Sequence, residues 1–156
     1  MKPNYKLLAT CIALPLLVGG LSALISGGGM SEYQELRQPP LSPPGWLFPV
    51  VWSVLYALMG AASYLVLRAG APREERAGAL RLYLAQLAVN FLWPPLFFLW
   101  GLFLVSLLWL MLLWGLVLAA TLRFARISPA AGKLLVPYLL WTTFAVYLNF
   151  GVYLLN

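Results

Sequence analysis

The stretch QLAVNFLWPPLFFLWGLFLVSLLWLMLLWG, residues 86–115, decides the fold class of this chain. It contains no charged residue, and the uncharged block around it runs from residue 82 to residue 122. A helix that spans a bilayer needs about 20 mostly apolar residues. The block is therefore long enough for two spans, and Gly101, next to an interfacial Trp100, is the natural turn between them.

Charged residues separate three further uncharged blocks, residues 7–31, 38–67 and 134–156, and each is long enough for one span. The chain is 63% hydrophobic and 9% charged, whereas soluble domains are about one quarter charged. The sequence thus predicts an all-α integral membrane protein, a single domain over residues 1–156 that forms a bundle of five transmembrane helices. The expected helices are about 5–26, 45–69, 78–100, 103–125 and 130–154.

The distribution of basic residues predicts the orientation. With five spans, one side of the membrane carries nine of the ten Lys and Arg residues: Lys2, Lys6, Arg68, Arg73, Arg76, Arg81, Arg123, Arg126 and Lys133. Arg37 alone lies on the other side. The positive-inside rule then places the N-terminus in the cytoplasm, and we expect a bacterial cytoplasmic membrane. The basic N-terminus and first apolar run resemble a signal peptide, but the run is long for an h-region and no A-x-A site ends it, so we expect no cleavage.

The composition also excludes whole classes of chemistry. The chain has no His and no Asp, so a His-Asp triad and a His-based metal or haem site are both excluded. The single cysteine, Cys11, excludes an intrachain disulfide. We expect no metal site and no required cofactor. The net charge is +6. We interpret the basic residues that produce it as determinants of membrane topology and as contacts to anionic membrane lipid, not as a nucleic-acid surface.

Polar and aromatic side chains recur together at helical spacing in three of the expected helices. The three stripes are Trp52, Tyr56, Met59 and Ser63; Gln86, Asn90, Trp93 and Phe97; and Trp141, Ala145 and Asn149. Lipid cannot satisfy an amide, so these faces should point into the bundle. Two interpretations stay open: interhelical hydrogen bonding, or a cavity lined by aromatic rings with a few polar groups, as in small-molecule sites.

The first connection, loop 27–44, is long and stiff. Its prolines Pro39, Pro40, Pro43 and Pro44 restrict the backbone. Before them, the segment SEYQELR predicts a short surface helix with Ser31 as its N-cap. We expect either a lid over the bundle or an ordinary rigid connector.

Three stretches resemble one protein family: PPGWLFPVVWSVLYALMGAASYLV (43–66), YLAQLAVNFLWPPLFF (83–98) and LLVPYLLWTTFAVYLN (134–149). They are similar to the most recognisable blocks of the translocator protein family, also called tryptophan-rich sensory proteins or peripheral-type benzodiazepine receptors. The resemblance, to a bacterial-type member, implies five transmembrane helices and a homodimer. It also implies a pocket under the first loop for porphyrins, isoquinoline and benzodiazepine drugs and, in animals, cholesterol.

The resemblance assigns the ligand contacts residue by residue. They are Tyr33 in the loop, which would close over the ligand, and Trp52, Tyr56, Asn90, Trp93, Phe97, Trp141 and Ala145 in the helices. Bacterial relatives are associated with light-dependent breakdown of protoporphyrin, and Trp52 and Trp141 match the tryptophans implicated there. A photoexcited porphyrin can oxidise a neighbouring indole or generate reactive oxygen, so this chemistry needs no general base.

The chain also departs from the family pattern. Gln38 and Leu41 stand where the family often has Lys and Trp in its first loop. The C-terminal Tyr-and-Arg motif of animal members is absent, so cholesterol recognition is not expected. Small residues, Gly60 with Ala57 and Ala61, and Gly115 with Ala119, permit close helix approach, either in a homodimer or in packing within one subunit.

Three functions follow as hypotheses. The leading one is a dimeric membrane sensor or binding protein for tetrapyrroles and other flat hydrophobic ligands. The enzyme alternative is light-dependent porphyrin degradation with Trp52 and Trp141 as the reactive groups. The transport alternative is a passive translocator of porphyrin or lipid. No charged residue lies deep in an expected span, which argues against an ion-driven carrier.

Overall fold

The computed structural model describes residues 2–27 and 29–156, the side chains of Gly29 and Met30 apart. Met1 and residue 28, which belongs to the expected lid 27–44, lie outside the described residues. The described part of the chain is helical and has no strand: α1 (Tyr5–Ser26), α2 (Gly29–Glu35), α3 (Leu47–Arg68), α4 (Arg73–Pro94), the π-helical turn η1 (Pro95–Leu99), α5 (Phe103–Ile127) and α6 (Pro129–Leu155).

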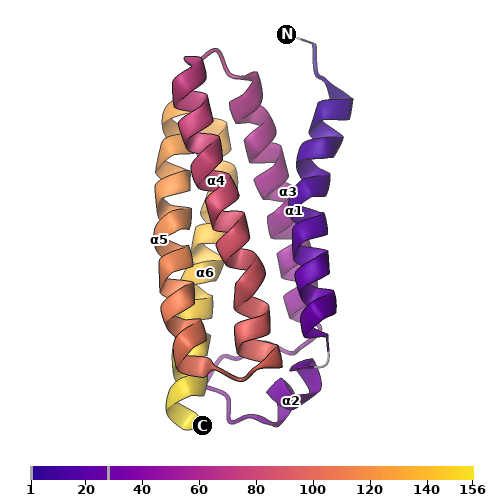
Figure 1. Cartoon of the computed structure of the whole chain (residues 1–156), viewed down its shortest axis with the longest axis vertical. Helices are drawn as coiled ribbons and strands as arrows, with labels where there is room; N and C mark the ends of the chain where they lie inside the picture. The colour runs from indigo at the N-terminus through magenta and orange to yellow at the C-terminus, as the bar shows by residue number, and fades with distance from the viewer. Residues whose placement is uncertain (1, 28) are drawn as a thin grey trace.

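Five long helices run side by side, and the short α2 lies across one end of them (Figure 1). Within the described residues, five helices are long and apolar enough to cross a membrane, with α4 and η1 together forming one of them. The predicted five-helix membrane bundle is confirmed, and the protein is an integral, multi-pass membrane protein. The N-terminus and the α3–α4 connection lie at the end opposite α2 and the C-terminus (Figure 1).

The starts of two helices differ from expectation by more than two residues. The third span begins at Arg73, where position 78 was expected, because Glu74 and Glu75 in the first turn stabilise the positive end of the helix dipole. Charged residues can continue a helix beyond the bilayer, so they do not mark its end. The role of Ser31 as N-cap was wrong: α2 begins at Gly29, because glycine can enter a helix at an entropic cost only.

The buried amides confirm the inward orientation of the polar stripes. Gln86 is 1% exposed, Asn90 2% and Asn149 0%. Each has a hydrogen-bonded partner on another helix, so the bundle supplies the bonds that lipid cannot.

Glycines set the closest helix contacts inside the chain. A Cβ atom on Gly60 would lie 2.4 Å from the Cα atom of Ile12, so α3 and α1 touch backbone to backbone there. A Cβ atom on Gly132 would lie 2.5 Å from the Cβ atom of Ala125, at the α5–α6 contact. The close approach at Gly60 is therefore internal to one chain. Gly115 has open space beside it, and the homodimer stays a prediction.

The proline pair interrupts the third long helix, α4 with η1, near its end. Pro95 has no N–H, so the carbonyl of Phe91 loses the partner that a continuous α-helix would give it. The hydroxyl of Ser22, on α1, donates to that carbonyl at 2.7 Å. The chain then passes through η1, and Gly101 turns it into α5 with φ of 62°. This break brings α1 and the end of α4 together beside the site.

Candidate ligand-binding site

The site lies at the end of the bundle that α2 covers, and Tyr33 of α2 forms its roof. The Tyr33 side chain is only 3% exposed. Its ring centroid lies 5.8 Å from that of Phe48, 5.7 Å from that of Phe97 and 5.4 Å from that of Phe98. Tyr33, in the connection between the first two long helices, is thus built into the aromatic cluster at this end of the bundle. Burial raises the pKa of the Tyr33 phenol, and a hydrogen bond with Ser42 opposes that shift, so the roof stays uncharged.

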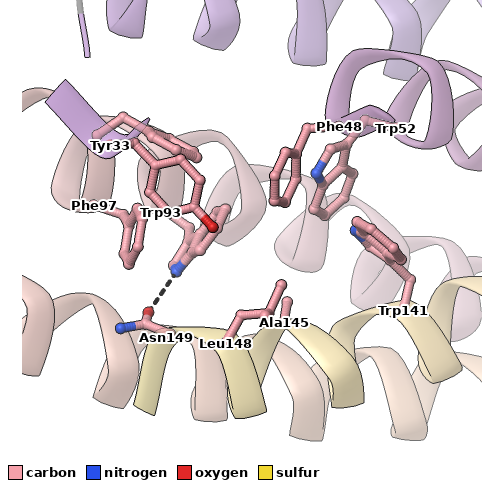
Figure 2. Close-up of a pocket in the computed structure, with 10 residues that line it drawn as sticks. Tyr33, Phe48, Trp52, Trp93, Phe97, Trp141, Ala145, Leu148 and Asn149 are labelled. Atoms are coloured by element: carbon pink, nitrogen blue, oxygen red, sulfur yellow. Dashed lines mark hydrogen bonds between the residues drawn. The ribbon is translucent and has the colours of Figure 1, made fainter. Parts of the chain in front are cut away.

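The walls of the site come from α3, α4, η1 and α6 (Figure 2). The lining residues are Tyr33, Phe48, Trp52, Trp93, Phe97, Phe98, Trp141, Ala145, Leu148 and Asn149. The cavity left between them is about 10 Å³, which is no more than one water molecule needs. The aromatic rings therefore fill their own pocket, and any ligand must displace some of them.

Trp93 is the best anchored of these rings. Its ring stacks on Phe97 with centroids 5.3 Å apart, and its indole Nε1 donates to the side-chain oxygen of Asn149 at 3.0 Å. Ser106 donates to the same oxygen at 3.1 Å, and the Asn149 nitrogen donates to the carbonyl of Phe103 at 2.9 Å. All polar atoms of Asn149 are thus used, and the indole of Trp93 is locked in place.

The indole of Trp141, unlike that of Trp93, is not held by a hydrogen bond. Its indole Nε1 is buried and has no hydrogen-bond partner among the described residues. The ring packs against Phe48 and Phe144, with centroid distances of 6.0 and 5.6 Å. Figure 2 shows its nitrogen on the side of the ring that faces Trp52. The pocket therefore contains a free N–H donor, and a buried donor without a partner costs about 1–3 kcal/mol.

Tyr56 and Asn90 lie one layer deeper than the pocket. The Tyr56 hydroxyl donates to the Asn90 oxygen at 2.9 Å, the Asn90 nitrogen donates to the Tyr138 hydroxyl at 2.7 Å, and Tyr138 donates to Gln86 at 2.7 Å. Trp52 stacks on Tyr56 with centroids 5.5 Å apart, so this chain of hydrogen bonds supports the pocket floor. Asn90 itself lines neither this pocket nor the neighbouring cavity on the α1 side, whereas Tyr56 lines that cavity.

The structure brings six of the eight expected ligand-binding residues to the pocket. They are Tyr33, Trp52, Trp93, Phe97, Trp141 and Ala145. In the part of the chain that the structure describes, no group of His, Cys, Asp or Glu side chains is placed so that it could hold a metal ion. The chemistry of the site is that of apolar contact and ring stacking, and the fully buried N–H group of Trp141 is left without a partner.

The match to known proteins agrees with this architecture. The profile of the TspO/MBR family matches residues 11–155, which is nearly the whole chain. The chain belongs to the TspO/MBR family. The expected family resemblance is confirmed.

Curated TspO/MBR relatives include a protein of Chlorobaculum tepidum named tryptophan-rich protein TspO, 41% identical over 157 residues, which cover 100% of this chain and 99% of the relative. The translocator protein of Bos taurus is 39% identical over 90% of this chain and 84% of its own length. The tryptophan-rich sensory protein of Cereibacter sphaeroides is 41% identical over 80% of this chain and 76% of its own length.

Four lining residues of this TspO/MBR pocket were not predicted as ligand contacts. Phe48 and Leu148 stand at helical spacing from Trp52 and Trp141, and Asn149 belongs to a predicted stripe, so a signal for each existed. Phe98 had none. It follows Phe97 directly, and the wider π-helical turn is what lets both rings face the site.

The loop over the TspO/MBR pocket is fastened to α6. The backbone N–H of Arg37 donates to the Asn156 side-chain oxygen at 3.1 Å, and the Asn156 nitrogen donates to the Arg37 carbonyl at 2.8 Å. The Tyr147 hydroxyl donates to the carbonyl of Pro40 at 2.7 Å. A Cβ atom on Gly151 would lie 2.5 Å from the ring of Pro39. We call these contacts of Asn156, Tyr147 and Gly151 the loop latch.

Proposed function

We propose that this TspO/MBR protein is a membrane sensor or binding protein for tetrapyrroles such as protoporphyrin, and for other flat hydrophobic molecules, in the pocket beneath α2. The observation that carries the proposal is an aromatic pocket in which a fully buried N–H donor, Trp141 Nε1, has no partner among the described residues. Small-molecule sites are typically apolar and aromatic, with few polar groups that fix orientation.

The lining rings favour a flat ligand. Each stacked or edge-on ring contact is worth about 0.5–1.5 kcal/mol beyond its buried area. Trp52, Trp93 and Phe97 already make such contacts with protein rings, so a flat π-system can exchange one aromatic neighbour for another. A carboxylate or carbonyl oxygen on the ligand would accept the hydrogen bond of Trp141, which removes the cost of its unpaired donor.

The pocket must open for such a ligand, because its cavity is about 10 Å³ and ligand pockets usually measure about 300–1,000 Å³. In our proposal α2 and the proline loop act as the lid. Tyr33 leaves the ring cluster while the loop latch holds the far side of the loop near α6. Release of Tyr33 exposes the ring faces of Phe48 and Phe97 to the ligand.

A dark titration with protoporphyrin tests the proposal. Purified protein in lipid nanodiscs should show saturable quenching of tryptophan fluorescence. Ala145→Leu, which adds volume where the pocket is already full, should weaken binding by about tenfold or more, since overpacking costs about 1–3 kcal/mol. Ala130→Leu, at an exposed position of the same helix, is the matched control. Absence of saturable binding, or equal affinity of Ala145→Leu and Ala130→Leu for protoporphyrin, would contradict the proposal.

A second candidate function is light-dependent porphyrin oxidation, and the position of Trp52 favours it. Its ring lines the pocket and lies 5.5 Å from Tyr56 and 6.1 Å from Tyr138, centroid to centroid. Light excites the porphyrin, the indole gives it one electron, and the porphyrin passes that electron to molecular oxygen, which becomes superoxide. The indole radical cation then takes one electron back from the porphyrin ring, which restores the tryptophan, and the porphyrin radical cation combines with superoxide to give an oxygenated porphyrin. Oxygen is the net oxidant, and the neighbouring phenols are electron-rich groups beside the oxidised indole.

We also propose that the end with the N-terminus faces the cytoplasm of a bacterial cell. The helix ends and connections at that end carry nine of the ten Lys and Arg residues, and Arg37 alone lies beside α2. Short connections on the cytoplasmic side of a membrane carry an excess of Lys and Arg.

A further inference from the structure

The loop that follows α2 runs back along α6 toward the middle of that helix. Its contacts with α6 come in order along the helix: Arg37 with Asn156, Pro39 with Gly151 and Pro40 with Tyr147. Because a helix rises about 1.5 Å per residue, these contacts extend about 13 Å along α6 (Figure 1). Leu41, the next residue, therefore stands at the far end of this path, beside a helix that can span the membrane.

Tyr147 places this part of the loop on the lipid-facing side of α6. Leu140, Tyr147 and Leu154 are exposed and follow each other at intervals of about two helical turns, so they lie on one face of α6. The hydroxyl of Tyr147 donates to the carbonyl of Pro40, the residue before Leu41. The loop thus reaches the surface that the bundle presents to lipid, as well as covering the pocket.

The backbone at this end of the loop suits an apolar surrounding. Pro39 and Pro40 have no N–H group that needs a partner. Their carbonyls both accept hydrogen bonds at 2.7 Å, the first from Ser42 and the second from Tyr147. Backbone that lies against lipid must have its polar groups paired within the protein. The proline pair meets this requirement, which a loop in water does not have.

Leu41 itself has a conformation and an exposure that contacts within the chain do not explain. It is the only residue other than glycine with a positive φ, 70°, in the part of the chain that the structure describes. That conformation is strained for leucine, and glycine or asparagine would relieve it. Its side chain is also 83% exposed, the highest value among the large apolar side chains described. A strained backbone that presents an apolar side chain outward indicates a partner outside the chain.

We propose that Leu41 inserts into the leaflet of the bilayer on the α2 side, so that lipid acyl chains cover its side chain and anchor the loop beside α6. Transfer of a leucine side chain out of water is favourable and offsets the strain of its backbone. Trp46 and Trp100 are exposed at helix ends at the same end of the bundle, as is typical of the interface between lipid and water. The anchoring does not depend on what the pocket beneath α2 binds.

Spin labels on single cysteines, in a Cys11→Ala background in nanodiscs, test the insertion. A nitroxide is attached at Leu41→Cys, at Glu35→Cys on the exposed side of α2, or at Leu140→Cys on the lipid-facing side of α6. Oxygen concentrates in the bilayer, whereas a neutral nickel chelate stays in water, so the ratio of their relaxation effects reports the depth of the label. We expect the ratio at Leu41→Cys to be well above that at Glu35→Cys and close to that at Leu140→Cys.

Hydrogen exchange of the unlabelled protein in nanodiscs is a second measurement. Leu41→Asn relieves the backbone strain but removes the apolar side chain. The amides of residues 37–46 should then exchange about tenfold faster, the effect of a 1.4 kcal/mol loss. Leu41→Met keeps an apolar side chain of similar size and is the matched control, which should exchange like the wild type.

Three results would overturn the proposal. A label at Leu41→Cys that meets the nickel chelate as readily as the one at Glu35→Cys would place the loop in water. Low accessibility of that label to both reagents would mean that protein, such as a second copy of the chain, covers the residue. Unchanged or slower exchange in Leu41→Asn would show that relief of strain outweighs any contact with lipid.

Discussion

The indole nitrogen of Trp93 lies 3.0 Å from the side-chain oxygen of Asn149, and this hydrogen bond joins α4 to α6 at the edge of the pocket. The same amide also binds Ser106 and Phe103 of α5. One fully buried side chain thus connects three membrane helices and fixes the orientation of a pocket tryptophan. Its replacement should affect the bundle as a whole.

We predict that Asn149→Leu lowers the free energy of unfolding by about 1–3 kcal/mol, because the Trp93 N–H group is left buried without a partner. A thermal melt in mild detergent measures this. The control is Thr143→Val, which removes the Trp114 hydrogen bond from an exposed threonine of the same helix. That bond should be worth about 0.6 kcal/mol, the average for polar contacts between membrane helices. An unchanged melt for Asn149→Leu would contradict the role of this amide.

The free indole of Trp141 leads to a different expectation. Trp141→Phe removes no hydrogen bond within the described protein, so the melting temperature should stay close to that of the wild type. Affinity for protoporphyrin should fall about 2–10-fold, the value of one hydrogen bond. Affinity for etioporphyrin, which has alkyl groups in place of the propionates, should not change. An equal loss for both porphyrins would mean that Trp141 contributes ring contact only.

The loop latch should control how readily the lid opens. Asn156→Ala removes both hydrogen bonds to the Arg37 backbone, so residues 33–46 should exchange amide hydrogen faster while α3 to α6 keep their protection. Porphyrin should then associate and dissociate faster. Asn4→Ala removes the amide cap of α1 at the opposite end of the bundle and is the control. Identical exchange of the loop in both variants would count against the latch.

Light-dependent chemistry should depend on the pocket indoles. Trp52→Phe and Trp141→Phe keep most of the ring contact but replace the indole with a ring that is much harder to oxidise. Illuminated protoporphyrin should therefore disappear more slowly in both variants than in the wild type, at matched occupancy. Trp109→Phe is the control, because Trp109 donates to the Val89 carbonyl outside the pocket. Full photodegradation by both pocket variants would reduce the effect to sensitised bleaching of a bound pigment.

The orientation can be tested with a pair of cysteines in a Cys11→Ala background. Gly70→Cys stands in the α3–α4 connection, where the added side chain meets open space, and Leu155→Cys stands at the exposed end of α6. In intact bacterial spheroplasts, a membrane-impermeant maleimide should label Leu155→Cys at once and Gly70→Cys only after permeabilisation. The reverse pattern would invert the proposed topology.

The sequence by itself determined the five spans and the inward orientation of Gln86, Asn90 and Asn149. The physical reason is the bilayer, which demands a minimum apolar length from each span and a protein partner for every buried amide. These constraints act on each helix separately, so they can be read from local patterns. The helical stripes likewise predicted most of the pocket wall.

Only the tertiary structure decided which of the aromatic and polar side chains line the pocket, which lie below it and which are hydrogen-bonded. It placed Tyr56 and Asn90 below the pocket, paired Trp93 with Asn149 and left the Trp141 donor free. Helical periodicity defines which residues share a face, but not the rotation and axial offset of one helix against another. The π-helical turn after the proline pair also shifts the register, and it brings Phe98 to the site beside Phe97. Such relationships arise from contacts between segments far apart in the chain, and the fold alone sets them.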